Sequence, residues 1–215
     1  MRIVLVDDHA IFRQGLRSLL EQKCWVEVVG EAADGREAIA LVEKLKPDVV
    51  IMDIAMSGLN GLEALLQLKN IHPSVKVIIL TMHTDDHYVF RALRYGASGY
   101  VYKGSTYEDL EMALRALQKN ETFLSPAVSQ VLIDGFLQNQ LRPDEQHNLI
   151  ELLSPREREI LQLVAEGNKR RQIAKMLSIS VKTVDRHKYN IKEKLKLHRE
   201  EELADFAKML GLTGL

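Results

Sequence analysis

Four consecutive apolar residues, Val49 to Met52, run directly into the carboxylate of Asp53. The run is rich in β-branched residues and is bounded by Pro47 and by the Ser57–Gly58 turn, which predicts a short strand that is buried on both faces. Strands of this kind occur in parallel sheets whose two faces are covered by helices. The run therefore favours an α/β fold, with Asp53 at the carboxyl end of a strand.

The same arrangement recurs at three other places in the chain: residues 2–6 run into Asp7 and Asp8, residues 76–80 into Thr81, and residues 99–102 into Lys103. Ligands of an open parallel sheet bind beyond the carboxyl ends of its strands, where the strand order reverses. We therefore expect three carboxylates, one hydroxyl and one ammonium group to meet at one rim of the sheet.

Segments with a helical spacing of apolar residues alternate with these runs. We expect strands at 2–6, 26–30, 49–52, 75–80 and 99–102, and helices at 9–20, 35–45, 61–71, 85–95 and 106–118. This alternation predicts a doubly wound α/β domain whose five-stranded parallel sheet has the flavodoxin-like order 2-1-3-4-5. The switch point of that order lies between the first and third strands, where Asp7, Asp8 and Asp53 would meet.

A cluster of three carboxylates limits the chemistry that this rim can support. The charges repel one another, so either some of the groups take up protons or a cation joins them. Ligation by oxygen favours a hard ion, Mg²⁺ or Mn²⁺. A carboxylate can also attack phosphorus and form an acyl phosphate, whose charge Lys103 would offset while Thr81 donates a hydrogen bond. A lone Asp at a strand end is more often a turn residue or a helix cap, but here four strand ends fit one site.

Residues 121–152 have the features of a helical connector and linker between a first domain, 1–120, and a last domain, 153–215. Ser125 has the form of a helix cap that is followed by Pro126 at the first helical position. An apolar helical stripe continues at Val128, Val131, Leu132 and Phe136, and the polar stretch 138–147 is expected to be a flexible linker.

The formal net charge of the chain, −1, conceals a strongly basic C-terminal segment. Residues 168–199 hold 11 Lys or Arg against 2 acidic residues. A solvated helical face is the ordinary explanation of a charge run, but this density indicates a polyanionic partner.

Helices are expected in the same region at 155–166, 170–177, 181–195 and 200–210, with a short turn at 178–180. Two short helices joined by a tight turn in a basic segment predict a small all-α helix-turn-helix domain that binds double-stranded DNA. One side of the third helix, formed by Val181, Val184, Ile191 and Leu195, would face the core. The other side would contact phosphates and base edges through Lys182, Arg186, Tyr189 and Asn190.

The single cysteine, Cys24, excludes an intrachain disulfide and favours a reducing compartment. No apolar run approaches the roughly 18 residues of a membrane span, and the start of the chain leads into a strand rather than a signal peptide. We therefore expect a cytoplasmic protein with no membrane partner.

Four motifs resemble the receiver domain of bacterial two-component response regulators: VDDH (6–9), VVIMD (49–53), LTMH (80–83) and GASGYVYK (96–103). LSPREREILQLVAEG (153–167), QIA (172–174) and ISVKTVDRH (179–187) are similar to the LuxR-type helix-turn-helix domain. Together the two halves resemble a response regulator of the NarL/FixJ type.

The resemblance implies that a sensor histidine kinase phosphorylates Asp53. It also implies that Asp8, Asp53 and the carbonyl of Ala55 hold Mg²⁺, with Asp7 acting through water. Thr81 and Tyr100 match the switch pair of the family, and Lys103 matches its phosphate partner. Such a protein is a switch rather than an enzyme, with slow self-catalysed phosphotransfer and dephosphorylation alone.

In the C-terminal domain, the resemblance implies that Asp185, Arg186 and Tyr189 read DNA, that Thr183 belongs to the helix-start pattern, and that the protein forms a homodimer when phosphorylated or DNA-bound. Lys169, Arg170 and Arg171 replace the commoner Ser-Asn-Lys and would strengthen contacts to the DNA backbone. Asp185 stands where Lys is usual. In the receiver, Ser57 and Gly104 likewise stand where other residues are usual.

Two alternatives come from other functional classes. One is a phosphorylation-independent DNA-binding regulator whose receiver serves for docking alone. The other is a phosphatase with an aspartyl nucleophile, but enzymes similar to the haloacid dehalogenases carry a second Asp two residues later, where this chain has Ala55.

Overall fold

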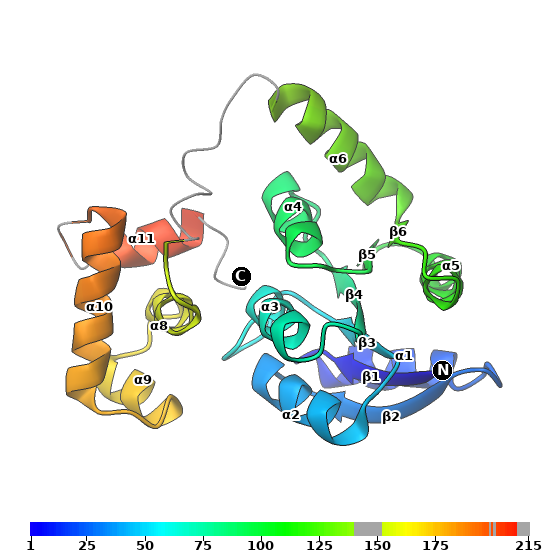
Figure 1. The fold of residues 1–215 in the computed structure, drawn as a ribbon, viewed down its shortest axis with the longest axis horizontal. Coiled ribbons are helices and arrows are strands. Elements are labelled where there is room, and N and C mark those ends of the chain that lie inside the picture. The colour runs from blue at the N-terminus through cyan, green and yellow to red at the C-terminus, as the bar shows by residue number, and fades with distance from the viewer. Residues whose placement is uncertain (140–151, 198, 200, 210–215) are drawn as a thin grey trace. The chain divides into compact units, whose positions relative to one another are not determined.

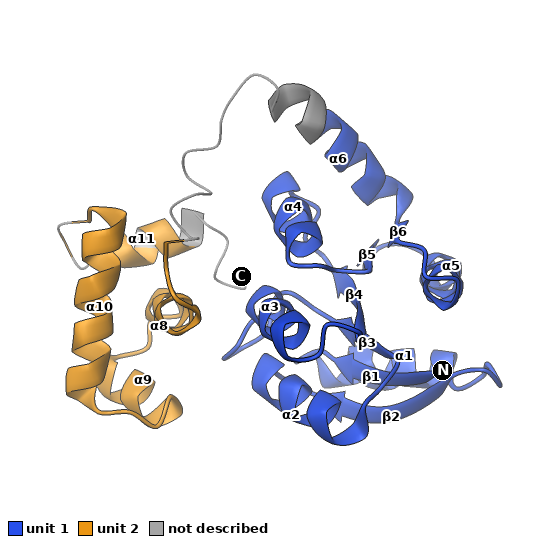
Figure 2. Ribbon diagram, viewed as in Figure 1, with its two compact units in different colours: residues 1–140 blue, residues 141–215 orange. Residues whose placement is uncertain are grey.

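The computed structural model describes residues 1–139, 152–197, 199 and 201–209 (Figure 1). The chain divides into two compact units, Met1–Gln140 and Leu141–Leu215 (Figure 2). Each unit has its own buried apolar residues. The first unit is an α/β sandwich and the second is helical.

A single parallel sheet in the order β2-β1-β3-β4-β5-β6 forms the centre of the first unit. Its strands are β1 (Arg2–Val6), β2 (Glu27–Ala32), β3 (Val49–Met52), β4 (Lys76–Thr81), β5 (Gly99–Tyr102) and β6 (Phe123–Leu124). The predicted order of the first five strands is confirmed. The prediction of five strands was wrong by one, because β6 has two residues, too few to show any periodicity in the sequence.

Six helices accompany the sheet: α1 (Ala10–Leu20), α2 (Gly35–Leu45), α3 (Gly61–Ile71), α4 (Asp86–Arg94), α5 (Tyr107–Gln118) and α6 (Pro126–Asn139). Side-chain caps fix the starts of several of them. Asp34 accepts hydrogen bonds at the start of α2, Asn60 at the start of α3, and Thr106 forms a capping box at the start of α5. These caps place the helices directly after the loops that leave the sheet.

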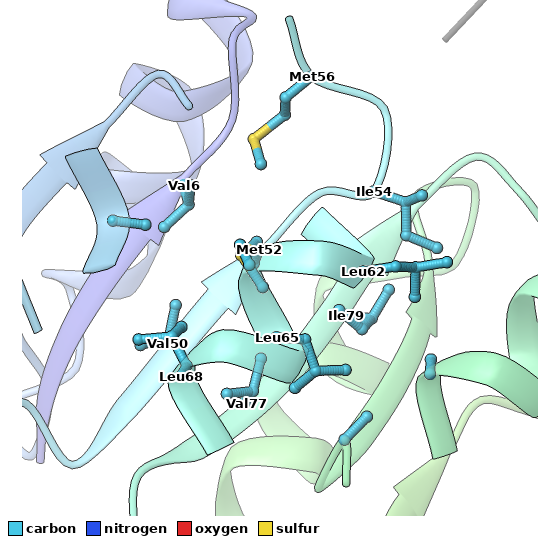
Figure 3. Packing of buried hydrophobic residues seen from close by; sticks show 14 of the residues in the cluster. Val6, Val50, Met52, Ile54, Met56, Leu62, Leu65, Leu68, Val77 and Ile79 are labelled. Carbon is cyan, nitrogen blue, oxygen red and sulfur yellow. The ribbon is translucent and has the colours of Figure 1, made fainter. Parts of the chain in front are cut away.

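Successive residues of each central strand point to opposite faces, and both faces are covered. Val50, Met52, Val77 and Ile79 face α3, where Leu65 and its neighbours pack against them (Figure 3). The alternate strand residues, such as Val49 and Ile51, belong to a second cluster that contains the apolar faces of α1 and α5. The prediction that 49–52 is buried on both faces is therefore confirmed.

Helix α6 belongs to the first unit. Val128 is fully buried in the cluster that lies under α3 and α4, and Val131 and Leu132 pack against the same cluster. The predicted helical stripe is thus confirmed at these positions. The linker expected at 138–147 begins inside α6, and its residues from 140 on lie outside the described part of the chain. The predicted division of the chain at 120 and 152 stays a prediction.

The described helices of the second unit are α8 (Pro155–Ala165), α9 (Arg170–Met176), α10 (Val181–Leu195) and α11 (Glu201–Met209). As predicted, Val184, Ile191 and Leu195 of α10 are buried in the core. Ser154 and Ser180 cap α8 and α10, and Ser178 adopts a left-handed φ of 51° in the turn before α10.

A charged contact ties α8 to α10. The ammonium group of Lys194 lies 2.6 Å from a carboxylate oxygen of Glu157, which is itself 3% exposed. Burial acts to raise the pKa of Glu157, but the bonds to Lys194 and Ser154 outweigh it and lower the pKa below its ordinary value. The buried carboxylate is therefore charged at neutral pH.

No helix in the described part of the chain is long and apolar enough to cross a membrane.

Gly61 lies against the main chain that carries Asp53. A Cβ added at Gly61 would lie 1.9 Å from the backbone oxygen of Asp53, whereas one added at Gly15 in α1 would meet nothing within 4 Å. We expect Gly61→Ala to lower the free energy of unfolding by about 1–3 kcal/mol, because the backbone must move aside. Gly15→Ala, the matched control, should raise it by about 0.5–1 kcal/mol. Urea denaturation followed by the fluorescence of Trp25 measures both, and an unchanged midpoint for Gly61→Ala would contradict the expectation.

Candidate functional site

Four strand ends meet at one rim of the sheet, as expected. Asp7 follows β1, Asp53 follows β3, Thr81 ends β4 and Lys103 follows β5. The ammonium nitrogen of Lys103 lies 2.7 Å from Asp7 Oδ2 and 2.5 Å from Asp53 Oδ2. Asp7 is 5% exposed and Asp53 4%, so the three groups form a nearly buried ionic cluster.

The charge of this cluster is unbalanced. Burial acts to lower the pKa of Lys103, but the carboxylates of Asp53 and Asp7 outweigh it and raise the pKa, so the side chain is charged at neutral pH. Asp8 adds a third carboxylate, and the formal charges of three carboxylates and one ammonium group sum to −2 at the rim. A donor set of carboxylate oxygens with that charge fits a hard divalent cation such as Mg²⁺.

Asp8 is the more exposed member of the cluster and lies beside His9. The side-chain ligand atoms of Asp7, Asp8 and His9 all lie within 4.8 Å of one another. His9 Nδ1 is 3.2 Å from Asp7 Oδ1 and 2.9 Å from Asp8 Oδ1. His9 was not among the predicted site residues, although its place directly after two carboxylates was a signal that it could reach them.

The carboxylate of Asp53 is held at both of its oxygens. Oδ1 accepts hydrogen bonds from the backbone N–H groups of Ile54, at 2.7 Å, and Ala55, at 3.4 Å. Oδ2 contacts Lys103. Ser57, in the same loop, donates its backbone N–H to Asp8 Oδ2 at 3.3 Å. The loop after β3 therefore orients two of the three carboxylates.

Gly104 lies against the ring of Tyr102. A Cβ added there would lie 2.3 Å from the ring of Tyr102, which packs against the core of the unit. Any larger residue would have to displace that ring.

Thr81 and Tyr100 meet at the backbone of His83. Both side chains are fully buried. The Thr81 hydroxyl oxygen accepts the N–H of His83 at 3.4 Å, and the Tyr100 hydroxyl donates to the His83 carbonyl at 2.7 Å. Burial raises the pKa of Tyr100, so the phenol stays protonated and can keep donating. The sequence did not indicate that one residue links the predicted pair.

The predicted DNA-binding residues lie on α9 and α10 and in the residue before α9. Seven of them are exposed: Lys169, Arg170, Arg171, Lys182, Asp185, Arg186 and Tyr189. Thr183 and Asn190 are half-buried. The Thr183 N–H donates to Ser180 Oγ at 3.0 Å, so this residue is also part of the cap that starts α10.

An ion pair within this surface was not foreseen. Arg170 Nη1 of α9 lies 3.7 Å from Asp185 Oδ2 of α10, and both side chains are about half exposed or more. Exposed pairs of this kind contribute little to stability. Opposite charges at the starts of two helices that a short turn joins were the signal available in the sequence.

Comparisons with known families match both units. Residues 3–115 match the response regulator receiver domain, and residues 151–207 match the bacterial regulatory proteins of the luxR family. The Oxygen regulatory protein NreC of Staphylococcus haemolyticus is 41% identical to this chain over 209 residues, which are 96% of each protein.

Solved structures give the same result. The RcsB response regulator of Salmonella enterica serovar Typhimurium, bound to a promoter in the presence of the phosphomimetic BeF₃⁻, is 33% identical with a TM-score of 0.61 and covers 96% of this chain and 97% of its own. A LuxR-family two-component response regulator from Aurantimonas sp. is 37% identical with a TM-score of 0.62 and covers 63% of this chain and 97% of its own.

Together with the ionic rim of the first unit and the basic helices of the second, these matches show what the protein is. The chain belongs to the two-component response regulators of the NarL/FixJ type, which are phosphorylation-regulated transcription regulators rather than classical enzymes.

Proposed function

We propose that Asp53 is the phosphoacceptor and that its phosphorylation by a sensor histidine kinase controls sequence-specific DNA binding. The observation that carries the proposal is the position of Asp53 at the carboxyl end of the central strand, with one oxygen held by backbone N–H groups and the other by Lys103. A carboxylate held in this way is oriented for attack and has a cation next to it.

In the proposed reaction, an Asp53 oxygen attacks the phosphorus of a phosphohistidine. A bond between oxygen and phosphorus forms as the bond between phosphorus and nitrogen breaks, and the imidazole leaves with the electron pair and takes up a proton. Lys103 then pairs with the new phosphoryl oxygens. Mg²⁺, held by Asp7, Asp8, Asp53 and the Ala55 carbonyl, would offset the negative charge that the phosphoryl group brings.

Loss of the phosphoryl group is proposed to be slow hydrolysis within the same site. Ala55 has no side-chain group that could hydrogen-bond to an attacking water. Slow hydrolysis would set the lifetime of the phosphorylated state without making the protein an enzyme that turns over a substrate.

Thr81 and Tyr100 are proposed to sense the phosphoryl group. The Thr81 hydroxyl is fully buried next to the rim, and a phosphoryl oxygen offers it a charged acceptor. The His83 backbone joins Thr81 to Tyr100 through two hydrogen bonds, and we propose that a change at one side chain is passed to the other along this path.

The α9–α10 surface is proposed to bind double-stranded DNA. Arg186 and Asn190 are suited to guanine and adenine edges, and Lys182 and the basic residues 169–171 are suited to phosphates. Asp185 could accept from a cytosine amino group. One solved structure similar to this chain is of two RcsB dimers bound to two parallel DNAs, and we propose that this chain also binds as a homodimer.

Asp53→Asn should abolish phosphorylation, because the amide cannot attack phosphorus as a carboxylate does. Intact-protein mass after incubation with acetyl phosphate and Mg²⁺ should show one phosphoryl adduct on the wild-type chain and none on the variant. The same incubation without Mg²⁺ is the control and should give little adduct. A wild-type chain that stays unlabelled would instead favour a DNA-binding regulator with a docking-only receiver.

Arg186→Ala should weaken binding to a selected DNA site by about 1–3 kcal/mol, which is roughly five- to 150-fold, through loss of a base contact. The probe is duplex DNA that the phosphorylated wild-type chain selects from a random pool. Arg186→Lys keeps the charge but not the planar fork, so it should retain affinity for random DNA and lose discrimination. Fluorescence anisotropy measures the ratio of affinities for the selected and the random duplex. The same ratio for the wild type, Arg186→Ala and Arg186→Lys would refute the assignment.

A further inference from the structure

We infer that Ser125 is the residue through which strand β5 controls helix α6. It is a positioning residue, and the inference rests on the proposed function, since Tyr100 of β5 is proposed there to sense phosphorylation. Ser125 is fully buried and stands between β6 and α6. Four groups of observations support this role.

The first group is the pairing of β6 with β5. In register, Phe123 lies opposite Gly99 and Leu124 opposite Tyr100. Ser125 continues this ladder, because its N–H donates to the carbonyl of Tyr100 at 3.0 Å. The backbone of the proposed sensing residue is therefore bonded directly to Ser125.

The second group is the side chain of Ser125. Its hydroxyl oxygen accepts the backbone N–H of Tyr102 at 3.3 Å. The chain turns into α6 at Pro126, so β6 supplies no further backbone partner there and the hydroxyl takes that place. Without it, the half-buried N–H of Tyr102 loses this partner, and the loss of a hydrogen bond there is unfavourable.

The third group is the start of α6. The carbonyl of Ser125 accepts the N–H groups of Val128, at 2.9 Å, and Ser129, at 3.0 Å. Ser125 thus joins the end of β6 to the first turn of α6. Its two bonds to β5 and its two bonds to α6 fix the direction in which α6 leaves the sheet.

The fourth group connects Ser125 to the phosphoacceptor rim. The hydroxyl of Thr81 is bonded to the N–H of His83, the carbonyl of His83 to the hydroxyl of Tyr100, and the carbonyl of Tyr100 to the N–H of Ser125. Val128 of α6 is buried in the same apolar cluster as Tyr100 and Val89 of α4. Hydrogen bonds and packing therefore both run from the rim to the start of α6.

A contiguous network alone does not demonstrate coupling, so the inference needs a measurement of coupling. Ser125→Ala removes the hydroxyl that holds Tyr102 and keeps the backbone bonds. Ser129→Ala is the matched control, because the Ser129 hydroxyl reaches only the carbonyls of Leu124 and Ser125 among the described contacts and does not touch β5.

Each protein is labelled with acetyl phosphate and Mg²⁺, and its affinity for the selected duplex DNA is measured before and after labelling. Ser125→Ala should label at the wild-type rate and bind DNA as the wild type does before labelling. The gain is the ratio of its DNA affinity after labelling to that before labelling. For Ser125→Ala this ratio should be about two- to tenfold smaller than for the wild type, because loss of one hydrogen bond has an effect of that size. Ser129→Ala should keep the full gain.

A full gain in Ser125→Ala would overturn the inference and leave the proposed function standing. Absence of any gain in the wild-type chain would instead contradict the proposed function. Hydrogen exchange of the wild-type chain gives a second test that needs no variant to fold. The amides of Ser125 and Val128 should change their exchange rates when BeF₃⁻ and Mg²⁺ are added, and unchanged rates at both amides would overturn the inference.

Discussion

Burial of the central strands on both faces is the constraint on which the rest of the first unit depends. A strand such as β3, whose four residues are all buried, has no side chain free for polar chemistry along its length. Polar groups are therefore confined to the strand ends, where the backbone leaves the sheet. In a parallel sheet these ends lie on one side, so Asp7, Asp53, Thr81 and Lys103 are brought together by the topology itself.

Burial of the carboxylates at the rim is unfavourable, and neighbouring groups offset it. Nearly buried carboxylates are unfavourable unless they are paired and hydrogen-bonded. Lys103 pairs with two of them, and the loop after β3 donates backbone N–H groups to Asp53 and Asp8. The remaining negative charge makes the site receptive to a divalent cation. In the proposed reaction, that cation and Lys103 would together offset the charge of the incoming phosphoryl group.

The sequence predicted the features that repeat or that extend over several residues. The bounds of β1, β3 and β5 and of α2 and α3 agree with prediction, because buried runs and helical spacing are local signals. The meeting of Asp7, Asp53 and Lys103 followed from the strand order. Features that depend on one side chain or on a contact between distant segments were not predictable in this way. Strand β6 has two residues, His83 acts through its backbone, and the contact of Arg170 with Asp185 depends on how two helices pack.

Strand β6 and helix α6 determine where the receiver of this regulator can be truncated or fused to another domain. Because β6 is the last strand of the sheet and Val128 is buried in the core, a receiver that ends near residue 120 loses a strand and leaves a cavity in the apolar cluster that contains Tyr100. Chimaeras that exchange receivers between regulators of this type should therefore be joined after α6. The receiver and α6 should therefore be exchanged together, because they share one apolar core.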